Sequence, residues 1–547
     1  MAETVLPGVS IEVRAEGLII PLGVTVGNLG VVGTASKGPV NTPVILGSYS
    51  EAQETFGNYD PWNDGAGELT LVRALELAFN QGATTAIAVR VADATPAGKA
   101  VPSSLTLKAG ADNVVTLVAK SPGTWGKEIE VKVEKAKDPA FVENEKVDGS
   151  PLKLDIVEVV KSARNRIRVK PAGGGAEQSL AIKYDEAAGP GEVNIKANGE
   201  LELGSPLDPS DEVFADYMVK AEKAHKVTLR YGNTEEVYNV VSGADLQRDL
   251  ADSVLVEGTT EGTFKPEKLP DELTFTRLTG GTNGVAGADY QSGLDALLNE
   301  PAHIIVAAGQ DDGFGNELAA HCQQASSDLL KRDRIAVVGS GLGATLSDLQ
   351  GHTINSDRVI FVGPGIKVND RAATPPVEVT LPGAYAAAAV AGLISSFEPH
   401  VSPTNKVLPV GGLETVFTTP ELRSLVQSRV LALEKRDGFR IVKGITTSTD
   451  TAWHQITTRR IVDYAKAGVR SAANPFIGKL NNDRVRGALR TSINSFLADM
   501  IDSEMLVSYE LDVSATRQQE IRGIVQVTMV LRPTFSIDFI RVTIFLE

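Results

Sequence analysis

One glycine-rich stretch has a spacing that could hold a nucleotide phosphate. Gly339–Gly343 follows a buried-looking strand at 335–338 and precedes a helical pattern, which is the context of a dinucleotide-binding turn. Such a turn also expects an acidic residue at the end of the next strand, where it would bind the ribose. Here the next strand, 359–362, ends in Gly363-Pro364. A tight turn between strand and helix therefore explains the glycines better, and a Rossmann-like NAD(P)-dependent oxidoreductase is kept as an alternative.

The other residue types that carry chemistry form no recognisable site. Gly126-Lys127 is followed by Glu128 and not by the Ser or Thr of a phosphate loop. The single cysteine, Cys322, lies in a helical pattern and excludes both a disulfide framework and a cysteine-based zinc site. No pair of histidines has the spacing of metal ligands on a helix; the six are His225, His303, His321, His352, His400 and His454. We therefore expect no cofactor, no metal and no enzyme.

The overall charge limits the possible partners. The chain has 547 residues, a formal net charge of -16 and a pI near 5.1. A nucleic-acid-binding protein concentrates Lys and Arg, so direct nucleic-acid binding is not expected. No run of about 18 apolar residues and no basic, apolar leader is present, so neither membrane insertion nor export is predicted.

One region has the opposite charge. Between residues 459 and 490, eight basic residues stand against Asp463 and Asp483, a local net charge of +6. These residues are either the solvated faces of two amphipathic helices or a docking surface for an acidic partner. The candidate docking residues are Arg459, Arg460, Lys466, Arg470, Lys479, Arg484, Arg486 and Arg490.

The order of strand and helix patterns predicts several domains. Buried strands, such as those at 86–91 and 303–308, alternate with helices in two separated stretches, which is typical of a discontinuous, largely parallel α/β domain. Between them lie short alternating strands and acidic turns, which predict an inserted all-β region of one or two subdomains facing solvent. Long helices expected at 456–472 and 482–503, followed by strands, predict a C-terminal α+β domain. The expected division is an N-terminal arm at 1–20, the α/β middle domain at 21–91 and 288–400, the insertion at 92–287, the α+β domain at 401–534 and a C-terminal arm at 535–547.

Both arms have the period-2 pattern of half-buried strands with nothing nearby to pair with. Apolar residues alternate with Ser10, Glu12 and Arg14 in the first arm and with Arg541 and Thr543 in the second. One explanation is that each arm adds a strand to a sheet in another molecule. The predicted arm residues are Val9, Ile11, Val13, Ile540, Val542, Ile544 and Leu546, and the predicted hinges are Gly17, Arg532 and Pro533.

Several stretches match one known family, in that family's order. They are Pro7–Glu12, Val31–Val44, Phe56-Gly57, Ala119–Gly126, Leu278–Gly284 with Asp289–Gln291, and Arg459–Tyr464 through Phe496-Leu497. With these stretches the chain resembles the contractile tail sheath proteins of bacteriophage tails, R-type bacteriocins and related injection systems. The loop at 473–482 departs from the family because it lacks the usual Trp-containing segment.

The resemblance implies a structural role. It implies a multidomain α/β and α+β fold whose terminal strands augment sheets of neighbouring subunits, in stacked rings that form a helical tube. The sheath would surround an inner tail tube protein, with the basic residues facing it, and would contract to drive that tube through a cell envelope. Baseplate and tail terminator proteins would be further partners. The location implied is a virion tail or extracellular injection particle, assembled in the host bacterial cytoplasm. A non-contractile virion subunit is a second alternative.

Overall fold

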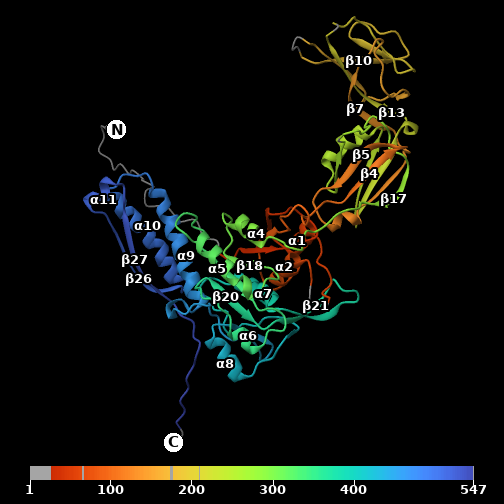
Figure 1. The fold of residues 1–547 in the computed structure, drawn as a ribbon. Helices are drawn as coiled ribbons and strands as arrows, with labels where there is room; N and C mark the ends of the chain where they lie inside the picture. The colour runs from red at the N-terminus through yellow and green to blue at the C-terminus, as the bar shows by residue number, and fades with distance from the viewer. Residues whose placement is uncertain (1–25, 64–66, 173–175, 209, 261, 546–547) are drawn as a thin grey trace, which may run out of the picture. The chain divides into compact units, whose positions relative to one another are not determined.

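The computed structural model describes residues 26–63, 67–172, 176–208, 210–260 and 262–545 (Figure 1). The chain has a mixed α/β, multidomain fold that divides into two compact units. Among the described residues, the first unit comprises those within 26–35, 39–94 and 285–545, and the second comprises those within 36–38 and 95–284. The second unit is therefore inserted into the sequence of the first.

A mixed sheet of eight strands forms the centre of the first unit, in the order β2-β3-β1-β18-β19-β20-β24-β25. The six inner strands are parallel, whereas β2 and β25 at the edges are antiparallel to their neighbours. Parallel strands covered on both faces read as continuous apolar runs, which is why the sequence revealed most of them. The bounds are β1 Leu29–Gly33, β2 Pro43–Leu46, β3 Ala86–Arg90, β18 Ile304–Ala307, β19 Ile335–Gly339, β20 Val359–Gly363, β24 Leu431–Lys435 and β25 Phe439–Ile441.

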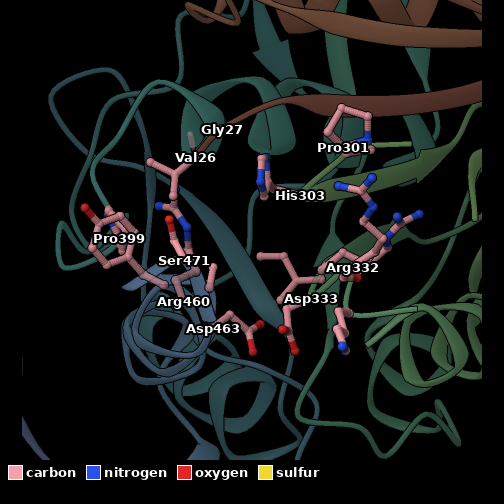
Figure 2. A pocket seen from close by; sticks show the side chains of 16 residues that line it. Val26, Gly27, Pro301, His303, Arg332, Asp333, Pro399, Arg460, Asp463 and Ser471 are labelled. Carbon is pink, nitrogen blue, oxygen red and sulfur yellow. Dashed lines mark hydrogen bonds between the residues drawn. The ribbon is translucent and has the colours of Figure 1, made fainter. Parts of the chain in front are cut away.

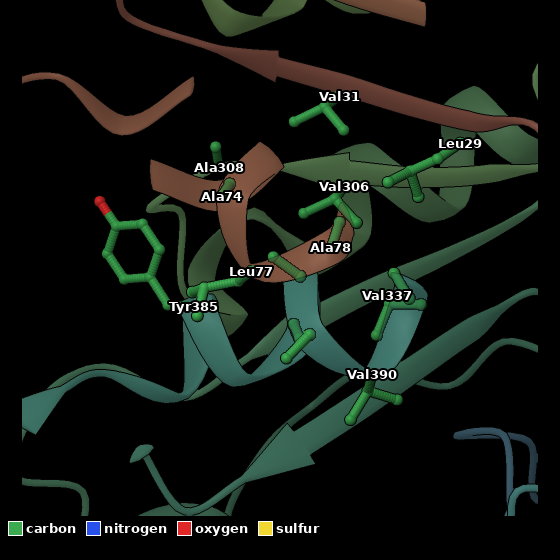
Figure 3. Close-up of a cluster of buried hydrophobic side chains, with 14 of the residues drawn as sticks. Leu29, Val31, Ala74, Leu77, Ala78, Val306, Ala308, Val337, Tyr385 and Val390 are labelled. Atoms are coloured by element: carbon green, nitrogen blue, oxygen red, sulfur yellow. The ribbon is translucent and has the colours of Figure 1, made fainter. Parts of the chain in front are cut away.

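Helices cover both faces of this sheet. On one face lie α1 (Tyr49–Phe56), α2 (Thr70–Asn80) and α7 (Gly383–Ser395), with their apolar side chains in one core (Figure 3). Gly392 lets α7 approach α2, since a Cβ there would lie 2.3 Å from the Ala78 carbonyl oxygen. On the other face lie α4 Tyr290–Leu297, α5 Gly315–Ala325, α6 Leu346–Gln350 and α8 Thr419–Gln427. A small sheet, β22-β21-β23, is formed by β21 Ile366–Asp370, β22 Val377–Leu381 and β23 Gly412–Leu413.

The end of the chain forms a layer of two helices and a hairpin. Helices α9 (Ile456–Ala473) and α10 (Asp483–Asp502) pack against each other and against the hairpin β26–β27. The hairpin strands are Leu506–Ser514 and Gln526–Pro533, joined through the short helix α11 (Arg517–Ile521). Gly468 on α9 makes the helix contact possible, because a Cβ there would overlap the ring of Phe496 on α10.

The second unit consists mainly of antiparallel sheets around two apolar cores. The sequence predicted that this unit is all β, and that prediction is wrong. The unit also contains helix α3 (Gly243–Asp249), which is capped by Ser242 and buries Leu246. The strands are β4 Ser104–Ala109, β5 Asp112–Ala119, β6 Glu130–Lys135, β7 Ala140–Val147, β8 Val159–Val160, β9 Arg166–Lys170, β10 Gln178–Tyr184, β11 Glu192–Ile195, β12 Leu201–Leu203, β13 Glu212–Val219, β14 His225–Tyr231, β15 Thr234–Val240, β16 Val256–Thr259 and β17 Leu273–Arg277.

Candidate assembly surface

The segment that follows β27 extends away from the body of the first unit (Figure 1). The Thr534 N–H donates to the Met505 carbonyl at 3.1 Å, and the Asp538 carboxylate accepts from Gln455 and pairs with Lys443 at 3.3 Å. Beyond Phe539, whose ring lies 5.6 Å from the Lys443 ammonium, no hydrogen bond or ion pair joins the segment to the rest of the described chain. Asp538 is therefore the last anchor.

The apolar side chains of this segment are exposed to solvent. Their exposed fractions range from 76% to 87% in the set Ile537, Phe539, Ile540, Val542, Ile544 and Phe545. Within the described residues, 535–545 form no strand and their amides donate no backbone hydrogen bond. Contiguous exposed apolar surface of this kind marks interaction sites. The predicted arm residue Leu546 lies outside the described residues, as do Val9, Ile11, Val13 and the predicted hinge Gly17.

The two-stranded sheet β26–β27 has both edges open among the described residues. Its inner face, with Tyr509, Leu511 and Met529, packs on the α9–α10 pair, yet these side chains are only half-buried. A two-stranded hairpin is marginally stable by itself, and open edges are sites where other strands add. The hairpin is thus a two-stranded sheet to which further strands can add, and the α9–α10 pair provides apolar side chains on one of its faces.

The predicted hinge residues Arg532 and Pro533 lie at the end of a paired strand. Both residues belong to the β26–β27 ladder, where Arg532 is opposite Ser508 and Pro533 is opposite Leu506. The alternating pattern of β27 continues through them, and proline is tolerated because it ends an edge strand. Regular pairing stops after Pro533, and the segment leaves the body after Asp538.

The eight basic residues of the 459–490 region do not form one exposed face. Arg459 and Arg460 are only 6% and 8% exposed. Arg459 pairs with Asp357 at 2.9 Å and with Asp463 at 2.6 Å, and Arg460 donates to the carbonyls of Phe397 and Glu398. The docking prediction is wrong for these two residues, because they fasten α9 to the rest of the first unit.

Two more of the eight basic residues, Lys466 and Arg470, bind the buried carboxylate of Asp333. It lies just before β19, and its oxygens accept from Lys466 and Arg470 on α9 and from Arg358 at 3.4 Å. Arg358 also makes two bonds to Asp463, at 2.8 and 3.1 Å. Burial alone would raise the pKa of Asp333, but the hydrogen bonds from Lys466 and Arg470 hold that pKa below its ordinary value. Charged side chains thus join α9 to the amino ends of β19 and β20.

The remaining basic residues lie near the start of α10. Arg486 pairs with Glu520 at 3.0 Å and with Asp483, so it connects α10 to the β26–β27 turn. Lys479, Arg484 and Arg490 are exposed. Beside them Ile477, Leu480 and Ile521 are 75% to 80% exposed, and Asn481 donates to the Ile524 carbonyl at 3.0 Å. The side chains Ile477, Lys479, Leu480, Arg484, Arg490 and Ile521 are called the tip cluster below.

The glycine stretch at 339–343 is bound by a carboxylate of its own chain. The Gly343 N–H donates to the Glu414 carboxylate at 2.5 Å, and the Gly365 N–H donates to its other oxygen at 3.1 Å. A Cβ on Gly339 would lie 1.9 Å from the Gly383 carbonyl oxygen, so this glycine is needed for close packing of α7. An internal carboxylate occupies the loop, and helix α6 after it has only five residues. The oxidoreductase alternative is unsupported.

A cavity of about 300 Å³ lies between α9 and the amino ends of the parallel strands (Figure 2). His303, Asp333, Arg460 and Asp463 line it. Burial lowers the pKa of His303 to about 4, so its imidazole is neutral and accepts from the Asn28 N–H at 3.3 Å. Asp333, Arg460 and Asp463 already pair with other charged groups or with carbonyls, so this cavity belongs to the contact between α9 and the sheet.

Other chemistry receives no support from the described residues. They contain no group of three or more His, Cys, Asp or Glu side chains that could hold a metal ion. Cys322 is buried, and burial raises the pKa of its thiol to about 12. Among the described helices, none is long and apolar enough to cross a membrane.

Comparison with known proteins identifies the family. Residues 283–447 match the phage tail sheath protein central domain, and residues 448–547 match the phage tail sheath C-terminal domain. In these two regions the chain is a member of the phage tail sheath family. The hairpin, the α9–α10 pair and the exposed segment all lie within its sheath C-terminal domain.

Individual sheath proteins share sequence or fold with this chain. The tail sheath protein of Staphylococcus phage Twort is 30% identical over 202 residues, which cover 35% of this chain and 33% of that protein. This chain thus matches a third of that relative's length. Sheath tail proteins from Desulfitobacterium hafniense and Listeria innocua are each 13% identical, with TM-scores of 0.58 and 0.59. The matches cover 96% of this chain and 100% of the first, and 95% of both chains for the second, so the sheath fold extends over nearly the whole chain.

The sequence did not reveal two residues that organise this sheath chain. Asp333 and Glu414 each accept hydrogen bonds from groups that are distant in the sequence, and neither residue belongs to a recognisable sequence motif. The Arg332-Asp333-Arg334 triplet before β19 was the available signal for the first. A lone acid between two arginines at the start of a buried strand favours an internal ion pair, because unpaired charge is rarely buried there.

Proposed function

We propose that this chain is the structural subunit of a contractile sheath. Copies stack as rings into a helical tube around an inner tail tube protein, and the tube is driven through a target cell envelope when the sheath contracts. Baseplate and tail terminator proteins bind the two ends of the assembly. The location is the tail of a virion or an extracellular injection particle assembled in a bacterial cytoplasm. The work is mechanical, so the chain is not an enzyme and takes no cofactor.

One observation carries this proposal beyond the family match. The segment 535–545 exposes a row of apolar side chains and has no strand partner in the described part of its own chain. The same chain offers the open edges of β26–β27 over an apolar helix pair. A segment that lacks a partner and a sheet that lacks strands complement each other between copies.

The arms explain how a sheath can change shape without coming apart. The residues Ile540, Val542 and Ile544 of one copy, and Val9, Ile11 and Val13 of another, add to the hairpin of a third. Strand pairing fixes the link between copies, while the stretch between Pro533 and the paired strand changes direction. Contraction then requires two packings of unchanged subunits, with the extended packing higher in free energy.

The two units have different places in the proposed sheath. The inserted unit, 95–284, faces outward, and the layer of α9, α10 and the hairpin faces the tube. In that layer the tip cluster contacts the tube, because it combines exposed apolar side chains with cations in an otherwise acidic chain. Cations favour an acidic tube surface and set the orientation of docking more than its strength.

The function is tested by electron microscopy of the purified chain with and without its tube protein. We expect hollow helical tubes from the chain alone and longer, tube-filled assemblies in the presence of the tube protein. Two helical lattices, extended and contracted, are expected among the assemblies. A single lattice under all conditions would favour a non-contractile virion subunit, and monomers at every concentration would contradict polymerisation.

Reversing charge in the tip cluster should separate tube docking from polymerisation. In the variant Lys479→Glu, Arg484→Glu, Arg490→Glu we expect empty sheaths and about a tenfold or greater loss of tube-filled ones, since like charges across an interface cost several kcal/mol. The matched control reverses three exposed cations elsewhere in the same unit, Lys331, Arg423 and Lys435. The measurement is the fraction of tube-filled sheaths in micrographs. If this fraction is the same for both variants, the tip cluster does not contact the tube.

A further inference from the structure

The cavity of about 300 Å³ beside α9 has two ends with different chemistry (Figure 2). Asp333 and Asp463 lie together at one end, and cations from α9 and from the residue just before β20 bind both carboxylates. His303 lies at the other end, just before β18. The acidic end is therefore satisfied by this chain itself, and the unpaired polar groups are at the His303 end.

His303 brings a hydrogen-bond donor to its end of the cavity. Its Nδ1 accepts from the Asn28 N–H at 3.3 Å, so the neutral ring carries its proton on Nε2. Burial, and then the charges of Arg334, Arg460 and Arg332, lower the pKa of His303 to about 4. The ring is therefore neutral at physiological pH, and no described residue accepts from its Nε2–H.

Two buried arginines lie beside this end, and neither forms an ion pair with a carboxylate of the described chain. Arg460 is 8% exposed and Arg334 is 1% exposed. Arg460 donates to the carbonyls of Phe397 and Glu398, and Arg334 donates to carbonyls at and just after the end of α4. Burial lowers the pKa of each to about 10, so both remain charged at neutral pH. Buried cations that bond only to neutral groups favour an anion in the adjoining cavity.

The rim of the cavity adds two exposed cations, Lys331 and Arg332. Neither side chain forms a hydrogen bond or an ion pair with a residue that the structure describes. Glu300 and Glu398 also lie in this region, since their charges act on Arg334 and Arg460, but neither carboxylate forms an ion pair in the described chain. This end of the cavity thus joins a histidine donor to several cations that no anion neutralises.

We infer that the His303 end of this cavity binds a small phosphate-bearing anion, either inorganic phosphate or a phosphate monoester. A phosphate group carries about two negative charges and several acceptor oxygens. These oxygens suit the His303 Nε2–H, the N–H groups that Arg460 has left, and the Arg332 guanidinium, because guanidinium groups bind phosphate with paired donors.

The size of the cavity fits such a ligand. A volume of about 300 Å³ corresponds to roughly ten water molecules, so a phosphate group with a small organic part has room. None of the lining residues belongs to the exposed segment 535–545 or to the tip cluster. The inference therefore goes beyond the proposed sheath function and does not depend on assembly.

Titration calorimetry of the full chain, below its critical concentration and at low salt, tests the site with inorganic phosphate. We expect one phosphate per chain with a Kd below about 1 mM. Arg332→Gln should weaken binding about tenfold, because a charge-assisted contact is lost, and Lys331→Gln should weaken it about threefold. The matched control is Arg423→Gln, at an exposed cation of α8 that does not line the cavity, where the Kd should stay within about twofold.

A parallel titration with adenosine monophosphate distinguishes the two sources of the phosphate group. Tighter binding of the monoester by about tenfold or more indicates an organic phosphate, and equal or weaker binding indicates free phosphate. Absence of saturable binding of both probes up to about 10 mM overturns the inference, and so does equal affinity of wild type and Arg332→Gln. Both substituted rim residues are exposed, so the fold should stay intact. Because the monomer is titrated, a failure here leaves the proposed sheath function unaffected.

Discussion

A chain that ends at Asp538 should remain folded and monomeric at concentrations where the complete chain forms polymers. The deletion removes residues 539–547 but keeps Asp538, which anchors the preceding residues to Lys443 and Gln455. The fold should be unaffected, because Ile540, Val542 and Ile544 are at least 76% exposed. Analytical ultracentrifugation and circular dichroism would report the two properties.

The expected loss of assembly follows from the apolar area that strand addition buries. Fully burying three branched apolar side chains contributes about 5–9 kcal/mol in gross terms. Association and ordering of the segment offset a large part of this gain. Losing even half of this free energy of association raises the critical concentration by about two orders of magnitude. Such a change takes assembly out of the accessible concentration range.

A point variant provides the matched comparison. Ile540→Ser, Val542→Ser and Ile544→Ser should behave like the deletion, whereas Val254→Ser, Leu329→Ser and Val416→Ser should assemble normally. The three control side chains are also large, apolar and more than half exposed. Equal assembly of the two triple variants would mean that the segment is not a donor strand.

The second large effect concerns Asp333, whose replacement by Ala should destabilise the first unit by about 3 kcal/mol. Its side chain is 4% exposed and accepts from Lys466, Arg470 and Arg358. Removing one partner of a buried ion pair leaves the other charges uncompensated, which costs about 3–5 kcal/mol, and the lower end fits because Lys466 and Arg470 can turn toward water. Urea denaturation followed by fluorescence measures the change. Asp328→Ala, at an exposed position of the same connection, should change stability by less than about 0.5 kcal/mol.

The contribution of Asp333 should depend on pH in a defined direction. Its pKa in the folded chain is below the ordinary value of 3.8. A depressed pKa stabilises the fold above the ordinary value, and that stability is lost as the pH falls through the folded-state pKa. The difference between wild type and Asp333→Ala should therefore be constant near neutral pH and decrease in strong acid. A difference that grows on acidification would show that Asp333 is not held as a carboxylate.

The sequence was most informative where structure depends on neighbours along the chain. The strands at 86–91, 303–308 and 359–362 were predicted within one or two residues of β3, β18 and β20. They are buried on both faces and read as unbroken apolar runs between turns. Helices α9 and α10 were found equally well, because their apolar positions recur with helical spacing.

The basic residues show where sequence reasoning fails. Arg459 pairs with Asp357, 102 positions earlier, and Lys466 and Arg470 pair with Asp333, 133 and 137 positions earlier. A run of cations on a helix looks the same in sequence whether solvent or a distant carboxylate faces it. Only the folded sheet brings those carboxylates to α9.

The segment 540–544 illustrates the opposite limit. Its alternation predicts a strand, yet the described chain forms none there. A strand needs a neighbour to receive its backbone hydrogen bonds, and no described part of this chain supplies one. We therefore propose that the strand partner of this segment lies in a second molecule.

Hydrogen–deuterium exchange on the full chain tests strand donation between copies most directly. Amides of residues 540–544 donate no backbone hydrogen bond in the described single chain, so they should exchange at near-intrinsic rates below the critical concentration. In assembled polymers those same amides, together with amides along the open hairpin edges, should be protected by about a hundredfold or more. Equally fast exchange of residues 540–544 in monomers and in polymers would contradict the account.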